Sequence, residues 1–597
     1  MNFLKTIFNP SFIVLLVYIA AFIRQYTWFA DNLVIAWVFS FVISFYLTFL
    51  IIKKLNYSKL NLNFFLIVGV PLIFFYSLRF VFPDASFDIV NYHFINGERA
   101  LRGYPFINGD FLYLSFANPI SDMITGIFRH LLGHRVGTVI NLLAIFWSAQ
   151  ILEKILSNFN LDRKIKYLIL IILLLFEGIT YQISNYWVEL LSIPIVLELV
   201  NLLVFKKKKD YIEYTIISLF CGILISFKLI NLIVVLPLSL LFLIQYIKDI
   251  DEKISKKYLK LFLLVLVFFA PIIPYHSYIF LITGNPFYPH LNFIFKSDLF
   301  HTINVLRQGL GPKDNVEAFF WPFIMLFKSE RLSNTPVFPY LTFLAYIFSL
   351  LALGLYKYFR SIKFPSVNFF SIFYFFAIFI WGFLSGDFRY VYYFEVLGGL
   401  LILTIILCLI LKNKKFFLKL NKMRFFNNLI IILIIPFFMF KFFTTLKMAR
   451  WYEWAGRPSI FDGSKTYISN MKYLFKDYSL SSYLPKESRE QMSKINAWIS
   501  VSPVVSGYMV LLNNKIPYVD LHHLSFRGKK GQNLFNQTII KNGPRIYSSL
   551  IEIDDILNWN FDESLKDLKN NNFKILSINK FNLPFFSDSI FYRKKFL

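Results

Sequence analysis

Apolar residues occur along the chain in long runs that alternate with short polar connections. Runs of about twenty residues begin near positions 7, 33, 63, 136, 167, 187, 213, 229, 259, 336, 368, 391 and 428. A helix of about twenty apolar residues spans the hydrocarbon core of a bilayer. The pattern therefore predicts an all-α polytopic membrane protein with about 13 transmembrane helices.

Positive charges mark alternate connections between these runs. They are Lys53, Lys54 and Lys59; Arg163, Lys164 and Lys166; Lys206 to Lys209; Lys253, Lys256 and Lys257; Lys357 and Arg360; and Lys412, Lys414, Lys415 and Arg424. Because cytoplasmic connections are enriched in Lys and Arg, we expect a multi-pass protein with a cytoplasmic N-terminus. The loops at about 83–135 and 284–335, and the chain after residue 445, are then expected outside.

Residues 446–597 lack long apolar runs. Short stretches at 497–501, 516–520 and 573–578 are typical of strands, and residues 562–571 carry two leucines at helical spacing. We therefore expect a transmembrane domain at 1–445 and a small extracytoplasmic α/β domain at 446–597.

The composition agrees with a membrane protein, because 57% hydrophobic residues in a chain of 597 are more than a soluble domain buries. Lys and Arg number 62 against 35 Asp and Glu, a balance that in a soluble chain suggests nucleic acid. Here the cations follow the connections, so we expect membrane lipids and no nucleic acid as partners. Cys221 and Cys408 lie within apolar runs, which predicts buried thiols and no disulfide.

Ionisable residues gather at the predicted outer ends of the runs. They are Asp88, Glu189, Lys228, Asp387, Arg389 and Glu395. Helix capping by Asp88, or pairing of Asp387 with Arg389, explains single members of this set. All six residues lie at a similar predicted depth in the membrane. Because ionisable residues at the ends of membrane spans need a partner or a function, this shared depth favours a reaction site at one face of the membrane. A transporter more often places such groups near the midplane, within repeated halves, of which the sequence offers little.

Several short motifs resemble the bacterial GT-C superfamily of membrane glycosyltransferases, of the protein mannosyltransferase and aminoarabinose transferase type. They are FDIVNYH at 87–93, YWVE at 186–189, SFKLIN at 226–231, GNPFYP at 284–289 and RY at 389–390. The resemblance implies a GT-C-like fold in the bacterial inner (plasma) membrane. It also implies a catalytic base in the first external loop, which falls on Asp88, with Asp84 as the nearby competitor. Glu189 is the nearest match to the family's second acidic position, although some relatives carry paired acids there.

The resemblance implies an inverting transfer of a sugar from a polyprenyl-phosphate donor to an extracytoplasmic glycan, lipid or protein acceptor. Cations would receive the charge of the departing phosphate, and a carboxylate would take the proton of the acceptor hydroxyl. The expected substrate-binding residues are Asp84, Tyr92, His93, Lys228, Asn231, Arg307, Arg331, Arg389 and Tyr390. Two alternatives stay open: a polysaccharide polymerase or ligase with a diphosphate-linked donor, and a lipid-linked glycan transporter.

The sequence identifies no cofactor and predicts no metal site. His130 and His134 have the spacing of metal ligands on a helix, but no third ligand accompanies them. Neighbouring Arg129 and Arg135 favour a cationic helix end at the interface instead. We find no GxSxG, HExxH, P-loop or CxxC motif that would indicate a hydrolase, protease, NTPase or redox enzyme.

Overall fold

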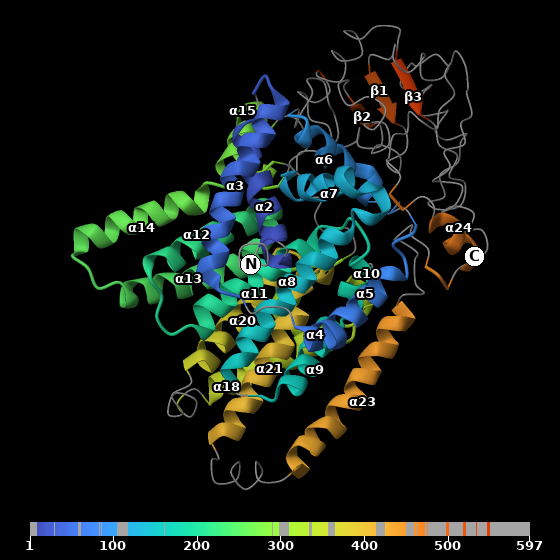
Figure 1. Cartoon of the computed structure of the whole chain (residues 1–597). Coiled ribbons are helices and arrows are strands. Elements are labelled where there is room, and N and C mark those ends of the chain that lie inside the picture. The colour runs from blue at the N-terminus through green and yellow to red at the C-terminus, as the bar shows by residue number, and fades with distance from the viewer. Residues whose placement is uncertain are drawn as a thin grey trace.

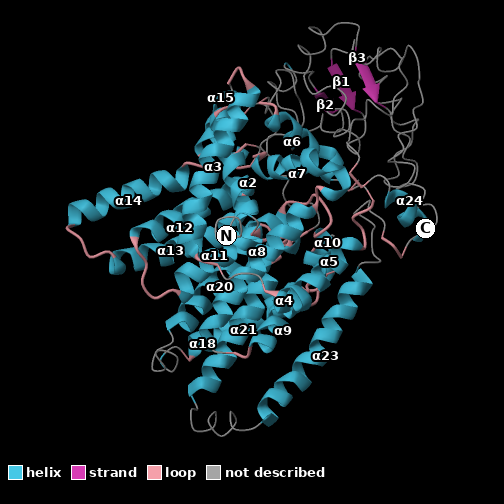
Figure 2. Cartoon of the chain, viewed as in Figure 1, coloured by secondary structure: helices cyan, strands magenta, loops and turns pink. Residues whose placement is uncertain are grey.

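A computed structural model of the chain describes residues 7–475 with internal gaps, and a few short segments beyond them. The gaps are residues 8, 29, 58–60, 83, 85, 87, 104–117, 160, 289, 298–309, 334–336, 356, 358–364, 413–423, 449–458, 462–463 and 472–473. The segments beyond are residues 497–500, 518–520, 533 and 546–549. The described part of the transmembrane region is a bundle of helices (Figures 1 and 2).

The helices follow the apolar runs in order. The first group is α2 (Pro10–Tyr26), α3 (Leu33–Leu55), α4 (Leu62–Phe64), η1 (Phe65–Gly69), α5 (Val70–Ser77), η2 (Ile89–His93), α6 (Phe94–Leu101), α7 (Ile120–Val136), α8 (Val139–Leu156), η4 (Ser157–Phe159), α9 (Arg163–Leu174) and α10 (Glu177–Gln182). The second is η5 (Glu189–Leu191), α11 (Ser192–Val200), η6 (Asn201–Phe205), α12 (Tyr211–Phe227), η7 (Leu229–Asn231), α13 (Leu232–Asp249), α14 (Ile254–Phe269) and α15 (Ile273–Thr283). The third is α16 (Asn292–Phe295), α17 (Asn315–Ile324), η8 (Ser329–Arg331), α18 (Tyr340–Gly354), α20 (Pro365–Leu384), η9 (Phe388–Val391), α21 (Tyr393–Lys412), α23 (Arg424–Met448) and α24 (Ser464–Asn470).

Each predicted apolar run contains one of these helical segments, so the chain is a helical membrane protein. Within the described residues, four helices are long and apolar enough to cross a membrane: Leu33–Leu55, Val139–Phe159, Leu229–Asp249 and Ser366–Leu384. The pair α14 and α15 qualifies together and is bent by 64°. Pro271 lies in the break, where its ring and missing N–H interrupt the helix. The apolar helices Pro10–Tyr26, Leu62–Ser77, Tyr211–Phe227 and Tyr340–Gly354 are shorter, and the total of about 13 spans stays a prediction.

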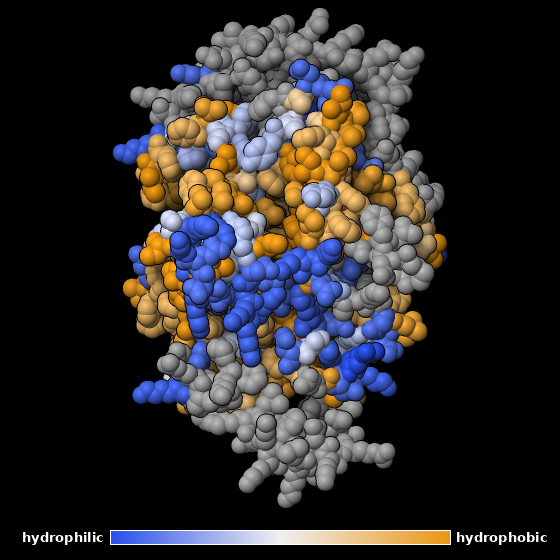
Figure 3. Space-filling view, turned by 60° about the vertical axis from the view of Figure 1, so that its left-hand side comes forward, coloured by the Kyte–Doolittle hydropathy of each residue, from blue (hydrophilic) through white to orange (hydrophobic). Residues whose placement is uncertain are grey.

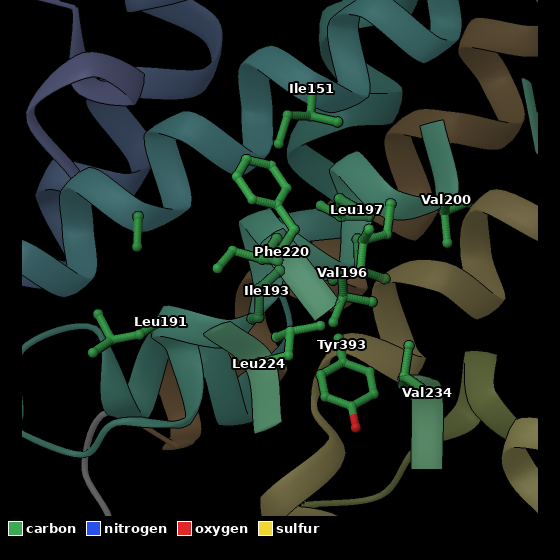
Figure 4. Packing of buried hydrophobic residues seen from close by; sticks show 14 of the residues in the cluster. Ile151, Leu191, Ile193, Val196, Leu197, Val200, Phe220, Leu224, Val234 and Tyr393 are labelled. Atoms are coloured by element: carbon green, nitrogen blue, oxygen red, sulfur yellow. The ribbon is translucent and has the colours of Figure 1, made fainter. Parts of the chain in front are cut away.

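Helix α11 forms the centre of the bundle, because every residue from Ser192 to Val200 is buried. A helix that is apolar on all sides is stable only when other helices surround it. Its side chains pack among α8, α12, α13 and α21, as Figure 4 shows for Ile193, Leu197, Phe220 and Tyr393. This packing fixes the helices whose ends carry the ionisable residues.

Helices α3 and α14 lie at the outside of the bundle and expose apolar side chains. In α14 only Leu264 is buried, while Leu259, Phe262 and Leu266 are exposed. Exposed apolar surface of this extent indicates contact with lipid. On the face shown in Figure 3, hydrophobic surface borders a patch of hydrophilic residues.

Cationic connections come together at one end of the bundle, as their sequence spacing predicts. Lys54 forms ion pairs with Asp210 and Glu213, and Lys209 lies 3.7 Å from the carboxylate of Asp249. These pairs join the ends of α3, η6, α12 and α13. Helix α12 runs from this end to Phe227, a rise of about 25 Å at 1.5 Å per residue. The connection after α12 therefore lies at the opposite end.

Helix α23 is tied to the bundle by a buried cation. Lys441 lies 3.4 Å from Glu395 of α21 and 4.0 Å from Glu177 of α10, and its side chain is 1% exposed. Glu395 also accepts hydrogen bonds from the backbone N–H groups of Leu341 and Thr342 at the start of α18. Glu395 is therefore bound by Lys441 and by the start of α18, and not by the other ionisable residues that the sequence predicts near it.

The segment after α23 packs on the chain just before the loop at about 83–135. The N–H of Ile460 donates to the backbone carbonyl of Leu78 at 2.9 Å. The hydroxyl of Tyr467 donates to the backbone carbonyl of Ser77. Tyr467 also packs against Phe82, with ring centroids 5.9 Å apart. The C-terminal region thus contacts the chain a few residues before Asp84.

Beyond residue 475 the structure describes three short parallel strands, β1 (Ala497–Ser500), β2 (Tyr518–Asp520) and β3 (Ile546–Ser549). β1 lies in the middle, with Trp498 opposite Tyr518 and Tyr547. β1 and β2 coincide with stretches that the sequence predicts as strands, whereas β3 was not predicted. The helix at 562–571 and the strand at 573–578 lie outside the described residues, so a complete α/β domain stays a prediction.

Candidate functional site

Four short helical turns that depart from the α-helix carry the predicted site residues. η2 is a π turn that directly follows Asp88, while η5 begins at Glu189. η7 follows Lys228, which has an extended backbone (φ −164°, ψ 126°) and separates α12 from α13. η9 contains Arg389. π turns such as η2 are frequent at functional sites, whereas 3₁₀ turns such as η5, η7 and η9 are common at the ends of α-helices.

Asp88 and Arg389 form an ion pair across 301 positions of sequence. Nη1 of Arg389 donates to Oδ2 of Asp88 at 2.7 Å, and the two side chains are 13% and 19% exposed, respectively. Asp88 lies at the N-terminus of η2, where it can complement the helix dipole, but its side chain makes no capping hydrogen bond there. The predicted pairing of Asp387 with the Arg389 side chain is wrong, because Asp387 instead accepts from the backbone N–H of Arg389 at 2.9 Å.

Glu189 and Lys228 form a second ion pair beside the first. Nζ of Lys228 donates to Oε1 of Glu189 at 2.9 Å. Tyr390 lies between the two cations: its hydroxyl accepts from Nη2 of Arg389 at 2.9 Å, and Nζ of Lys228 lies 3.9 Å from its ring centroid. Burial opposes the charge of Lys228, yet Glu189 and Tyr390 raise the pKa of the amine above its ordinary value, so it stays protonated. The site thus holds two carboxylates and two permanent cations.

Burial is strong around this site. Burial raises the pKa of Asp387 above its ordinary value, and Arg389 opposes that rise. Burial and the charge of Asp88 raise the pKa of Tyr92, which therefore remains a neutral hydroxyl at any ordinary pH. Burial and the charge of Lys228 lower the pKa of His290 to about 4, so this imidazole is neutral near pH 7.

The segment before Glu189 is held in place by three polar side chains from other elements. Oδ2 of Asp84 accepts from the backbone N–H of Tyr186 at 2.7 Å, and Oδ1 accepts from the N–H of Ser86 at 3.0 Å. Nε1 of Trp187 donates to the Ser86 hydroxyl at 2.9 Å. Nδ2 of Asn141, on α8, donates to the carbonyl of Trp187 at 3.0 Å. Asp84 is fully buried with both carboxylate oxygens engaged, so it holds the backbone and is not presented to a substrate.

The loop that carries Asp387 and Arg389 is fixed by two buried tryptophans. Nε1 of Trp381 donates to the carbonyl of Asp387 at 3.1 Å, and Nε1 of Trp321 donates to that of Gly386 at 3.0 Å. Gly386 has a positive φ of 65°, which glycine adopts without steric cost. Trp321 belongs to α17, so the loop at about 284–335 helps to position Arg389.

Other predicted substrate-binding residues have different surroundings. Nδ2 of Asn231 donates to the carbonyl of Leu224 at 2.8 Å and stabilises the break after α12. Arg331 donates to Glu317 and to the carbonyl of Gly311, each at 2.6 Å, which occupies its guanidinium group. Arg307 lies outside the described residues.

The two histidines with helical spacing face separate partners. Nε2 of His130 lies 3.0 Å from Glu98, while Nε2 of His134 lies 3.3 Å from the carbonyl of Asp84. In the part of the chain that the structure describes, no group of three or more His, Cys, Asp or Glu side chains is arranged to hold a metal ion. Glu98 is also bound by Arg129 in a buried pair, and Arg129 packs over the ring of Phe94.

No family model and no curated protein matches the chain. The chemistry of the site is therefore inferred from its own residues. Sequence reasoning missed Asn141, Asp122 and His290, which contact or electrostatically affect the predicted residues. Only Asn141 carried a signal, as a polar residue within a predicted span. The other two lie far along the chain from their partners.

Proposed function

We propose that the protein is an inverting membrane glycosyltransferase that moves a sugar from a polyprenyl-phosphate donor to an extracytoplasmic glycan, lipid or protein acceptor. The observation that carries the proposal is the convergence of two carboxylates and two cations at one end of a membrane bundle, in the Asp88–Arg389 and Glu189–Lys228 pairs. The motif resemblance to GT-C glycosyltransferases supports the same reading.

The cations suit a lipid-linked phosphate. Arg389 has a planar fork that binds two phosphate oxygens, whereas Lys228 acts as a point charge. In the structure, Asp88 accepts a hydrogen bond from the Arg389 guanidinium. A donor phosphate brings a competing negative charge, so in the proposed mechanism Arg389 shifts from Asp88 to the phosphate. Lys228 keeps Glu189 as a partner and adds positive charge beside the leaving group.

Release from Arg389 leaves Asp88 as the catalytic base. The acceptor oxygen forms a bond to the anomeric carbon while the bond from that carbon to the phosphate oxygen breaks. The hydroxyl proton passes to Asp88, and the bonding pair leaves with polyprenyl phosphate, whose charge the two cations stabilise. A single displacement of this kind inverts the anomeric centre. Because both oxygens of Asp84 are bound to backbone N–H groups, Asp84 is proposed as a positioning residue and Asp88 as the base.

The proposed topology places this chemistry outside the cell. The site and the paired cations lie at opposite ends of α12, which agrees with about 13 spans, a cytoplasmic N-terminus and a C-terminal α/β domain outside. The contact of Tyr467 with Phe82 links that C-terminal region to the chain just before Asp84. In the proposal the C-terminal domain selects the acceptor.

Purified full-length protein, incubated with labelled polyprenyl-phosphate sugars and candidate acceptors, tests the proposal. We expect covalent sugar transfer, and we expect Asp88→Asn to reduce kcat by about 10²–10⁴-fold, the usual contribution of a general base. Asp251→Asn is the matched control, because Asp251 is exposed at the opposite end of the bundle. Full activity of Asp88→Asn would refute its role as the base. Transfer only from diphosphate-linked oligosaccharides would identify a polymerase or ligase, and translocation without a covalent product would identify a transporter.

A further inference from the structure

A buried histidine and aspartate form a pair beside the proposed base. Nδ1 of His93, the last residue of η2, donates to Oδ1 of Asp122 on α7 at 2.5 Å. His93 is 8% exposed and Asp122 is 2% exposed. A carboxylate on Nδ1 fixes the ring and the tautomer, and leaves the lone pair of the other ring nitrogen available for a proton.

The second nitrogen of this ring is available. Among the described residues, Nε2 of His93 has no hydrogen-bond partner, and it is not one of the fully buried polar atoms. The ring packs against that of Tyr92 with centroids 4.1 Å apart, which restricts its rotation. Both nitrogens are therefore in defined positions, with one on Asp122 and the other open.

The π turn places His93 five positions after Asp88. Because a π-helix is closed by hydrogen bonds between residues five positions apart, His93 lies about one turn further along the same side of this segment. His93 is also close enough to Glu189 for its charge to affect that carboxylate. The open nitrogen thus belongs to the same end of the bundle as both proposed acidic residues.

We propose that the His93–Asp122 pair receives the proton that Asp88 takes from the acceptor hydroxyl and passes it to water. The inference rests on the proposed function. Asp88 transfers the proton to Nε2 of His93, the imidazolium is stabilised by Asp122, and release to water restores the neutral ring. Asp88 is then a carboxylate again and can return to Arg389 when polyprenyl phosphate leaves. His93 is a proton-accepting residue, and Asp122 is its positioning residue.

The groups that surround the pair are part of the expected pH response. Asp88 and Tyr92 belong to the same segment as His93, and Glu189 faces it from η5. Tyr275 of α15 lies near enough to Asp122 to be affected by its charge. A neutral imidazole can accept a proton and an imidazolium cannot, so a proton path through His93 makes kcat rise as the pH is raised.

The test measures kcat from pH 5 to pH 8 for the full-length protein and two variants. We expect His93→Gln to lower kcat at pH 7.5 by at least about tenfold and to abolish the rise with pH. Asp122→Asn, which keeps the shape of the side chain, is expected to weaken the rise because it no longer fixes the tautomer. The control is His130→Gln on the same helix as Asp122, where the His130 side chain is 50% exposed, and it should keep the original profile.

Thermal unfolding of each variant separates loss of fold from loss of proton transfer. If either variant unfolds in detergent at the assay temperature, the other decides the question. An unchanged pH profile in a folded His93→Gln or Asp122→Asn protein would overturn the inference and leave the proposed function intact. Absence of sugar transfer by the unaltered protein from every donor would instead refute the proposed function, and the proton path with it.

Discussion

Gly386→Ala tests whether the loop that carries Arg389 is as tightly fitted as its contacts indicate. Gly386 has φ of 65°, where a side chain costs about 1–2 kcal/mol. An added Cβ would lie 2.3 Å from Cδ of Pro312 and 2.9 Å from Cα of Gly311. These neighbours are a ring and a backbone atom, and overpacking of this kind costs about 1–3 kcal/mol. Together the two effects destabilise the folded state by about 2–5 kcal/mol.

The assay is thermal unfolding of the purified protein, followed by tryptophan fluorescence. Trp321 is a suitable reporter, because its indole donates to the Gly386 carbonyl and lies 3.0 Å from the position of the new Cβ. Gly354→Ala is the matched control, since Gly354 ends α18 and has no atom within 4 Å of an added Cβ. Alanine there should be neutral or stabilising by up to about 1 kcal/mol.

The two glycine variants must therefore move Tm in different directions or by clearly different amounts. We also expect Gly386→Ala to reduce sugar transfer more than Gly354→Ala, because Arg389 follows Gly386 by three residues. Equal Tm values for Gly386→Ala and the unaltered protein would refute the geometry of the loop. A loss of Tm with full retention of transfer would show that the fit of the loop is unrelated to catalysis.

Two further predictions concern buried charges outside the two ion pairs of the candidate site. Lys441→Met leaves Glu395 and Glu177 without their cation and should destabilise the fold by about 3 kcal/mol, whereas Lys447→Met on the same helix, at an exposed position, should have little effect on Tm. Burial would raise the pKa of Glu98, but neighbouring cations lower it to about 2, from an ordinary value of 4.5. Its contribution, about 3 kcal/mol, is present above pH 4.5 and is lost as the pH falls toward 2. The Tm difference between the unaltered protein and Glu98→Gln should therefore shrink on acidification, and a constant difference would contradict the assignment.

The positions of the helices were readable from the sequence because apolar runs are long and their period is unambiguous. The cationic connections likewise predicted which helix ends lie at the same end of the bundle. The ion pairs of Lys54 and Lys209 confirm that the helix ends beside these two connections meet. Two breaks carry local signals in the sequence: Pro271 at the bend after α14, and the charge of Lys228 between the runs that begin near 213 and 229. The extended backbone of Lys228 itself has no such signal.

The site was predicted as a set of residues at one depth, not as a set of contacts. Depth follows from position along an apolar run, so Asp88, Glu189, Lys228 and Arg389 were found together. Which carboxylate meets which cation depends on how distant helices pack, and the sequence does not contain that information in any short motif. The same limit applies to His93 and Asp122, which lie on different helices 29 residues apart.

The pairing itself has a chemical consequence that depth alone does not suggest. Asp88 is paired with Arg389 and Glu189 is paired with Lys228, so neither cation needs a bound anion to balance its charge. In the proposed mechanism, a donor phosphate therefore competes with Asp88 for Arg389. This competition would couple donor binding to release of the proposed base, because Asp88 would become free to accept a proton only when the phosphate is in place. Such coupling would also disfavour premature activation of water, since the base stays bound to Arg389 until a donor arrives.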